Sequence, residues 1–235
     1  MTWKAYLLMV ISVVLILIII VAGFVIYTPQ PVKFKNIGKA APFTLQDQNN
    51  NTVTLNNYTG KVLILDFIYT HCPNPNGTLG ECSTETLKMN TLMGDLINMG
   101  YNSSDFHLIS ISFDWKFDNA STMLAYGKDR AEGKFQYWSF LSGNQQEVNN
   151  ATAGYHISAV YNNVTNSLNQ TVPEVTQPAT NNLVEYMTHS LQIVLIDKQG
   201  NIEVPLDSHG SMTLINNIYW KASDVAKMVN VLINQ

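Results

Sequence analysis

This chain has few charged residues, only two cysteines and no visible internal repeat. Only 13% of its 235 residues are charged and its formal net charge is −4, which argues against a nucleic-acid partner because phosphate binding needs a basic face. Residues 61–235 hold nine basic and sixteen acidic side chains, so this part is more acidic still. Abundant Asn, Gln, Ser and Thr indicate a surface solvated by neutral polar groups, as in extracytoplasmic proteins. Any thiol chemistry depends on the single cysteine pair.

One long hydrophobic run stands near the N-terminus. Leu7–Tyr27 is nearly all Leu, Ile, Val, Met and Ala and carries no charge, and about 20 apolar residues are enough to cross a bilayer core. The alternative is a cleavable signal peptide with Val21–Gly23 as the small-residue cleavage site, but the length favours an anchor. We therefore predict a transmembrane anchor over residues 1–28, a linker over 29–40 and one domain over 41–235.

Two sequence signals disagree about the side of the membrane. Lys33, Lys35 and Lys39 follow the hydrophobic run, and the positive-inside rule would keep that flank inside. The glycosylation acceptor pattern Asn-x-Ser/Thr, typical of an outside domain, begins at eight positions: Asn50, Asn57, Asn76, Asn102, Asn119, Asn150, Asn163 and Asn169. We expect a single-pass membrane protein with its domain on the extracytoplasmic face, where a two-cysteine exchange or metal site also fits.

The stretch Val62–Cys82 organises the rest of the chain. Residues 62–69 are apolar, β-branched and aromatic, which predicts a buried central strand. Both cysteines follow it, and apolar residues at helical spacing then predict a helix that stops near Gly100: Met89, Leu92, Met93, Leu96 and Ile97. Sulfur at the end of a strand and beside a helix N-terminus favours thiolate over thiol. Such thiolates can exchange disulfides or hold a soft metal.

The remaining pattern alternates short strands with helices. Strands are predicted at 41–45, 52–55, 106–113, 137–141, 191–196 and 202–204, and helices at 119–128, 145–155 and around an apolar face formed by Val225, Met228, Val229, Leu232 and Ile233. Residues 158–185 are rich in Asn, Thr, Gln, Val and Pro, which indicates a surface insertion. This order predicts an α/β sandwich with a mixed sheet.

Several motifs resemble one family. Phe67–Pro73, FIYTHCP, resembles the motif that opens the metal site of the Sco/SenC family of copper chaperones. The opening strand Ala41–Leu45, the stretch Ser112–Asp118, residues 124–126 and Tyr186–Ser190 resemble further family segments in the same order. The resemblance covers about residues 40–232. It implies a thioredoxin-like fold, with a mixed central sheet flanked by helices, preceded by one N-terminal transmembrane helix.

The chain departs from the family pattern at two points. The family usually places three residues between its cysteines, whereas nine separate Cys72 from Cys82. Cys82 still directly precedes the predicted helix, so an insertion over 74–81 accounts for the spacing. Trp115 stands where the family usually has proline.

The resemblance also implies the ligands and the cargo. Cys72, Cys82 and His189 would bind copper as Cu(I), which prefers thiolate and accepts imidazole, with Cu(II) as a second form. A capping or core role is the alternative for His189. Asp114 and Asp118 are candidate auxiliary residues that would hold the other nitrogen of the histidine or weakly ligate oxidised copper. Their alternatives are a turn residue for Asp114 and a helix cap for Asp118.

Four other residues near this stretch have less specific interpretations. Alternation along the strand turns His71 away from the cysteines, so we expect a surface role for it. Asp66 marks the more exposed face of the central strand, with a buried proton acceptor as the alternative. Met89 and Met93 look like a methionine ligand pair, but at helical spacing we expect core packing.

Three functions fit these residues. The first is a membrane-anchored metallochaperone that delivers copper to the copper-centre subunit of a terminal (cytochrome) oxidase, without enzymatic turnover. The second is a thiol-disulfide oxidoreductase acting on cysteines of an oxidase or another exported protein, although exchange enzymes usually keep their cysteines closer. The third is a binding module whose Cys72–Cys82 bridge only closes a loop, adding about 3 kcal/mol. Only the first function needs His189.

Overall fold

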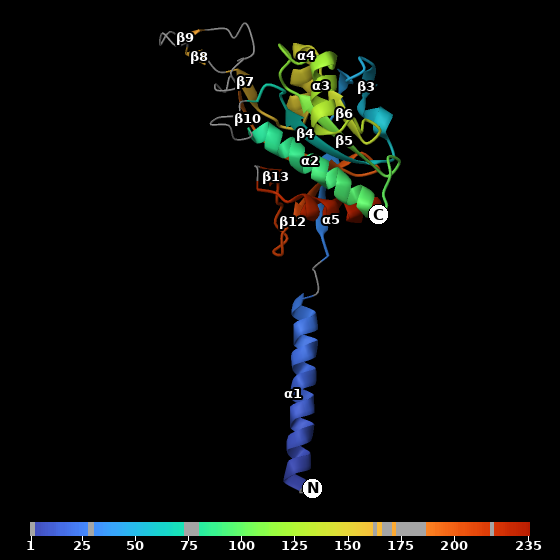
Figure 1. The fold of residues 1–235 in the computed structure, drawn as a ribbon, viewed down its shortest axis with the longest axis vertical. Coiled ribbons are helices and arrows are strands. Elements are labelled where there is room, and N and C mark those ends of the chain that lie inside the picture. Colours follow the sequence, from blue (N-terminus) through green and yellow to red (C-terminus); the bar gives the residue numbers. More distant parts are fainter. Residues whose placement is uncertain are drawn as a thin grey trace. The chain divides into compact units, whose positions relative to one another are not determined.

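A computed structural model describes residues 3–27, 31–72, 80–161, 164–165, 171–172, 187–216 and 219–235 of the chain. They form two compact units, Met1–Val32 and Lys33–Gln235 (Figure 1). Most of the predicted insertion over 158–185 lies outside the described residues, as do 73–79, Tyr186 and the acceptor positions Asn76, Asn163 and Asn169. Within the insertion, β7 (Ala159–Tyr161), β8 (Val164–Thr165) and β9 (Thr171–Val172) are described.

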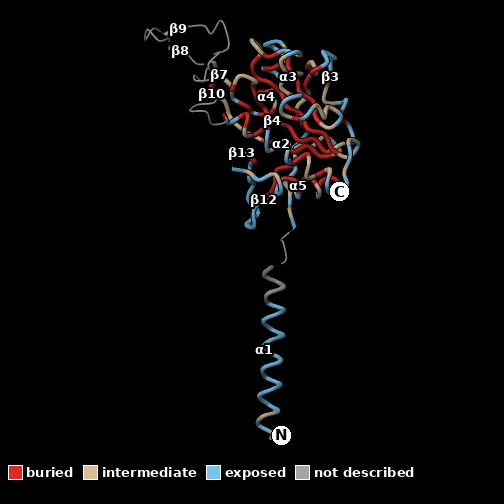
Figure 2. Tube along the Cα trace, viewed as in Figure 1, coloured by how far each residue is buried: buried red, intermediate tan, exposed pale blue. Residues whose placement is uncertain are grey.

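The first unit contains one apolar helix, α1 (Trp3–Tyr27). Its described side chains are almost all exposed, in contrast to the buried interior of the second unit (Figure 2). Residues Trp3–Ala22 are long and apolar enough to cross a membrane. A helix also satisfies all of its backbone hydrogen bonds internally, as a bilayer requires. The helix therefore fits the predicted membrane anchor.

The second unit is built on a seven-stranded sheet with β4 (Val62–Ile68) near its middle. β4 pairs in parallel with β5 (Phe106–Ser112), and β5 in parallel with β6 (Trp138–Leu141). On its other side β4 pairs antiparallel with β11 (Gln192–Ile196), which β12 (Asn201–Leu206) and β13 (Ile215–Asn216) both flank. The parallel pairs need crossover helices, whereas a tight turn joins β11 to β12. The predicted mixed sheet is confirmed.

Three helices cover one face of this sheet. α2 (Glu81–Asn98) packs against α3 (Ala120–Arg130) and α5 (Ala222–Ile233), and α3 and α5 also contact β6 and β4. Met89 and Met93 of α2 are fully buried, so they are core residues as expected. Gly100 follows the end of α2 with a φ of +95°, a conformation that glycine adopts without strain and that ends the helix.

Smaller elements cover the opposite face. The hairpin of β2 (Thr44–Gln46) and β3 (Thr52–Thr54), a 3-10 turn (Leu55–Tyr58) and α4 (Gln145–Gly154) lie around it. Tyr155, just after α4, packs on Phe67 with ring centroids 5.7 Å apart. Because Phe67 and Asp66 are neighbours on β4, their side chains point to opposite faces. Both faces of the central strand are therefore covered.

The predicted linker over 29–40 is partly wrong. Residues Lys33–Lys39 form strand β1, which lies at the edge of the sheet and pairs antiparallel with β12 from Lys33↔Leu206 to Lys39↔Asn201. An edge strand needs little apolar surface, and only Phe34 packs against the core here. Three lysines and a glycine therefore concealed the strand in the sequence.

The expected exposure of Asp66 is wrong as well, because this side chain is fully buried. Ser110 on β5 donates a hydrogen bond of 2.5 Å to Asp66 Oδ1, and the Trp138 indole donates to Ser110 Oγ at 2.8 Å. The second oxygen, Oδ2, has no hydrogen-bond partner among the described residues. Burial raises the pKa of Asp66 to about 7. A polar residue within an apolar run predicted an exposed side chain. Both faces of the central strand are covered, however, so no side chain on it reaches solvent.

This burial predicts that the domain loses stability as pH rises. The folded state holds the Asp66 proton more tightly than the unfolded chain, so the contribution is complete below about pH 4 and lost as pH rises through 7. A shift of this size corresponds to at most about 4 kcal/mol. In Asp66→Asn, the free energy of unfolding should fall much less between pH 4 and pH 8, measured by denaturant unfolding of the full chain in detergent. Asp207→Asn, at an exposed position, is the control, and identical pH profiles for Asp66→Asn and the unmodified chain would contradict the prediction.

Candidate metal centre

The two cysteines meet where β4 ends and α2 begins. Cys72 lies four residues beyond β4 and is 8% exposed, while Cys82 is fully buried. α2 starts at Glu81 with Gly80 as its N-cap, so Cys82 lies inside the first turn rather than before the helix as predicted. The helix dipole there favours negative charge on a nearby sulfur. Both thiols are free in the structure.

His189 is brought to the cysteines by a two-stranded ribbon. It ends β10 (Met187–His189), which pairs antiparallel with β7. Two aromatic rings fix the imidazole: the Phe113 centroid lies 4.8 Å away and the Tyr69 centroid 5.5 Å away. Nε2 of His189 lies 3.6 Å from Cys82 Sγ, and Nδ1 lies 3.3 Å from the Ser190 carbonyl. The Ser190 carbonyl can accept a hydrogen bond from Nδ1, which would leave the Nε2 lone pair for a metal held beside the sulfurs.

The donor atoms of Cys72, Cys82 and His189 all lie within 4.8 Å of one another. Two sulfurs and one imidazole nitrogen in a mostly buried pocket suit a soft cation of low coordination number. The structure therefore brings together the three ligands that the resemblance implied. That they bind a metal stays a prediction.

The pKa values of the two thiols are shifted in opposite directions. The hydrogen bond from the Cys82 thiol, helped by His189, lowers the pKa of Cys72 to about 5 despite partial burial. Burial and the adjacent Cys72 raise the pKa of Cys82 well above its usual range. At neutral pH the pair therefore consists of a Cys72 thiolate and a Cys82 thiol. Binding a metal through both sulfurs would release the Cys82 proton.

Glu85 is a buried carboxyl group that no pattern in the sequence indicated. It lies on α2 three residues after Cys82, is 1% exposed, and neither of its oxygens has a hydrogen-bond partner among the described residues. Burial, then the proximity of Asp66, raises the pKa of Glu85 well above its usual range. A protonated Glu85 adds no negative charge beside the thiolate. Nothing in its helical position distinguishes it from a surface glutamate in sequence.

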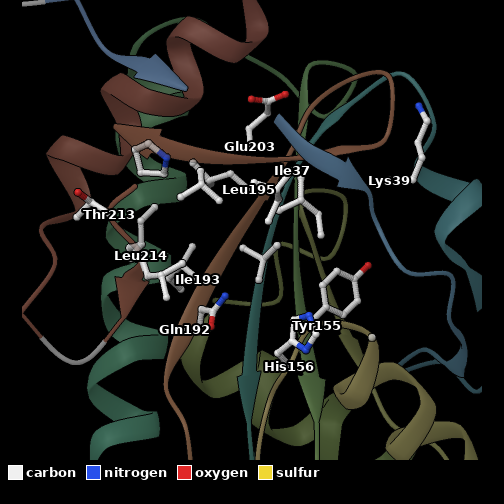
Figure 3. Close-up of a pocket in the computed structure, with 16 residues that line it drawn as sticks. Ile37, Lys39, Tyr155, His156, Gln192, Ile193, Leu195, Glu203, Thr213 and Leu214 are labelled. Atoms are coloured by element: carbon white, nitrogen blue, oxygen red, sulfur yellow. The ribbon is translucent and has the colours of Figure 1, made fainter. Parts of the chain in front are cut away.

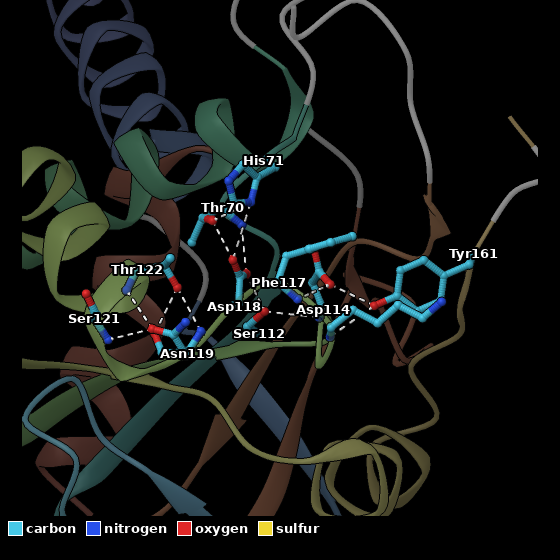
Figure 4. A network of polar contacts seen from close by, with 11 residues as sticks. Thr70, His71, Ser112, Asp114, Phe117, Asp118, Asn119, Ser121, Thr122 and Tyr161 are labelled. Carbon is cyan, nitrogen blue, oxygen red and sulfur yellow. Dashed lines mark hydrogen bonds and ion pairs between the residues drawn. The ribbon is translucent and has the colours of Figure 1, made fainter. Parts of the chain in front are cut away.

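A second group of polar residues holds the chain just before Cys72 (Figure 4). The Asp118 carboxylate accepts hydrogen bonds from the Thr70 backbone N–H at 2.9 Å, from Thr70 Oγ1 at 2.5 Å and from Ser112 Oγ at 2.6 Å. Asp118 Oδ1 also lies 3.6 Å from His71 Nδ1, and this contact raises the pKa of His71. Asp114 accepts from the Tyr161 hydroxyl at 2.7 Å. These bonds tie the segment after β4 to the loop after β5.

This network corrects several expectations. The histidine near Asp118 is His71 and not His189, whose Nδ1 faces the Ser190 carbonyl. The helix-cap alternative for Asp118 is wrong, because the Asn119 side chain caps α3. The turn role of Asp114 is confirmed by its hydrogen bond from the Phe117 N–H.

His71 and residues 159–161 also differ from expectation. His71 is apart from the Cys72–Cys82–His189 group as predicted, but its side chain is only 31% exposed and belongs to the Asp118 network rather than to an open surface. The prediction of a surface insertion over 158–185 is wrong for residues 159–161. They instead form β7, which positions His189 through β10 and supplies the Tyr161 hydroxyl to Asp114. The polar composition of the following residues concealed this strand.

The fold and the centre together define a class: a thioredoxin-like domain that carries two cysteines at a helix N-terminus and one histidine from a distant strand. The SCO1/SenC family model matches residues 34–219, which is more than half of the chain. The chain therefore belongs to the SCO1/SenC family.

Individual relatives agree with this assignment. The SCO1 protein homolog of Bacillus subtilis (strain 168) is 30% identical over 105 residues, and the match spans 45% of this chain and about half (49%) of that relative. The structure of Bradyrhizobium japonicum ScoI with copper bound superposes with a TM-score of 0.59 at 21% identity, covering 83% of this chain and 99% of the other. Yeast Sco1 with copper bound gives 0.57 at 21% identity, covering 82% and 88%. At these identities the structural likeness shows the fold alone.

The charge distribution in the centre predicts the reactivity of Cys72. Alkylation of Cys72 by iodoacetamide, followed by mass spectrometry, should be half-maximal near pH 5 instead of near the ordinary cysteine value of about 8.5. Cys82→Ala removes the main hydrogen-bond donor and should move the midpoint upward by at least about one pH unit. His209→Ala, on an exposed turn, should leave it unchanged. A midpoint above pH 8 in the unmodified protein would show that Cys72 is not a thiolate at neutral pH.

Proposed function

We propose that this protein is a copper carrier anchored in a membrane. It binds one copper ion as Cu(I) through Cys72, Cys82 and His189 and passes it to the copper-centre subunit of a terminal oxidase. The observation that carries the proposal is the convergence of two sulfurs and one imidazole nitrogen within 4.8 Å in a member of the SCO1/SenC family. The reported structures of family proteins with copper bound support the choice of metal.

The chemistry of the donor set supports Cu(I) over harder ions. Thiolate sulfur and imidazole nitrogen are soft or intermediate donors, and three of them match the low coordination number of Cu(I). Cu(II) would favour additional oxygen donors. The oxygens of Asp114 and Asp118 are already engaged by Thr70, Ser112 and Tyr161, so we assign these aspartates to positioning the Cys72 segment rather than to ligation.

Delivery needs exchange of the ion between thiolate sites and no chemical turnover, so we assign the protein to carriers rather than to enzymes. Helix α1 holds it in the membrane, and the domain faces the extracytoplasmic side, as its Asn-x-Ser/Thr pattern indicates. A relative named BsSco, of the Sco family of cytochrome c oxidase assembly proteins, has the same fold with a TM-score of 0.58 at 20% identity, over 87% of this chain and 98% of that one. Because this chain belongs to the same family, its membership supports an oxidase as the acceptor.

Copper titration tests the carrier function. The reduced, metal-free chain, titrated with Cu(I) against a competing chelator, should bind one equivalent. His189→Ala, Cys72→Ser and Cys82→Ser should each weaken binding by at least about 100-fold, because each removes one donor of three. His71→Ala, which removes a nearby histidine outside the group, should keep binding within about tenfold. Unchanged affinity in His189→Ala would exclude that residue as a ligand and remove the basis of the proposal.

Thiol-disulfide exchange is the second candidate, favoured by a Cys72 thiolate next to a Cys82 thiol. The Cys72 thiolate would attack a disulfide of an exported protein and release one target thiolate. Cys82, after losing its proton, would then attack the mixed disulfide, so the target disulfide is reduced and a Cys72–Cys82 disulfide forms. Buried Asp66 and Glu85 lie near this pair as carboxyl groups with raised pKa values.

His189 separates the two candidates. We expect the reduced protein to reduce insulin disulfides slowly. If exchange is the function, the rate should change less than about threefold in His189→Ala, since exchange uses only sulfur. If His189→Ala loses copper binding and still reduces insulin at the same rate, the protein has both activities, and only copper binding depends on His189. Rapid insulin reduction by a chain that binds no copper would replace the carrier function with the enzyme.

A further inference from the structure

Four large apolar side chains of the second unit are exposed close to one another. We call Ile37, Met212, Leu214 and Tyr219 the apolar tip; they are 52%, 53%, 50% and 82% exposed. Ile37 and Leu214 line one cavity of about 200 Å³ (Figure 3). Leu214 and Tyr219 line a second cavity of about 560 Å³, whose other wall is formed by α5. Exposed apolar side chains that share surface hollows in this way mark an interaction site more often than scattered ones do.

One residue of the apolar tip, Met212, lies close to the first residue of the second unit. Met212 forms a β-bridge with Leu206, and Leu206 pairs with Lys33, the first residue of β1. Five residues, 28–32, join the last residue of α1 to Lys33. A chain of this length, fully extended, spans about 20 Å. The surface of a bilayer that holds α1 is therefore within reach of the apolar tip.

Charge is distributed to suit the same surface. Lys33 and Lys35 are exposed on β1, whereas residues 61–235 hold nine basic and sixteen acidic side chains. Glu203, which lines the first cavity, is 9% exposed, and burial raises its pKa. The two carboxylates that line the second cavity are engaged locally. Asp207 accepts hydrogen bonds from the His209 and Ser211 N–H groups, and Asp224 pairs with Lys227 at 3.1 Å. Basic residues beside an anchor attract anionic headgroups, and tyrosine is favoured at a membrane interface.

We propose that the apolar tip, together with Lys33 and Lys35, contacts the anionic surface of the bilayer in which α1 is anchored. The inference rests on the anchoring by α1 proposed above. Docking would also restrain the metal centre. β13, which follows Leu214, pairs with β11 at Gln192, three residues after His189. The contact therefore holds the strand that continues from a copper ligand near the bilayer, where an integral membrane acceptor would present its own copper site.

Hydroxyl-radical footprinting of the full chain tests this contact. The chain is compared in amphipol, in nanodiscs of phosphatidylcholine, and in nanodiscs of phosphatidylcholine mixed with phosphatidylglycerol. Met99 is the matched control, because it is 47% exposed and lies at the far end of α2 from the cysteines. Met212 and Tyr219 should be protected at least about threefold in the anionic discs relative to amphipol, with Met99 unchanged. Equal reactivity of Met212 in anionic discs and amphipol would overturn the proposal.

A charge-reversal pair separates lipid attraction from simple proximity. Lys33→Glu/Lys35→Glu should restore the Met212 reactivity in anionic discs toward its amphipol value, whereas Lys128→Glu/Lys134→Glu, on and after α3, should not. Equal protection in both lipid mixtures would overturn the role given to the lysines. Co-elution of the chain with the discs verifies insertion of α1, and copper titration of the same samples verifies the centre. A failure of this contact is thereby distinguishable from a failure of the carrier function.

Discussion

The hydrogen bonds of the Asp118 carboxylate determine how the chain leaves β4. They hold the Thr70 backbone and side chain and tie both to Ser112 at the end of β5. Cys72 comes two residues later, so its position follows from this junction of two adjacent parallel strands. Cys72 lies next to the first turn of α2, which contains the fully buried Cys82. A centre of three donors needs this kind of rigid support, because a displacement of about 1 Å would separate sulfur from metal.

Burial of acidic groups accompanies the centre and shapes its chemistry. Cys82 and Glu85 of α2 and Asp66 of β4 all lie in the interior, and burial raises the pKa of each. At neutral pH Cys82 and Glu85 stay protonated and Asp66, with a pKa of about 7, is partly ionised, so the Cys72 thiolate carries the largest negative charge of this group. That arrangement keeps one sulfur ready to accept a cation or attack a disulfide. It also makes the interior less stable when the carboxyl groups ionise, which links the stability of the fold to the pH of its surroundings.

The three lysines that follow α1 have a role in the folded domain. As a sequence signal they contradicted an extracytoplasmic domain, because basic flanks usually stay inside. In the structure Lys33, Lys35 and Lys39 belong to a strand of the folded domain, and Lys39 Nζ donates to the Gln199 carbonyl. Their position after α1 is therefore explained by their place in strand β1. In our proposal Lys33 and Lys35 also contact lipid.

The sequence alone determined the central strand, most of the strands and helices around it, the apolar N-terminal helix and the candidate pair of cysteines, because periodicity and residue type are local properties. The approach of His189 followed only from resemblance, and its distance from Cys82 was set by the pairing of β10 with β7. Tertiary structure also decided that Asp66 and Glu85 are buried, that Asp118 holds His71, and that Lys33–Lys39 is a strand. Each of these depends on which distant segment covers a residue, and no local pattern carries that information.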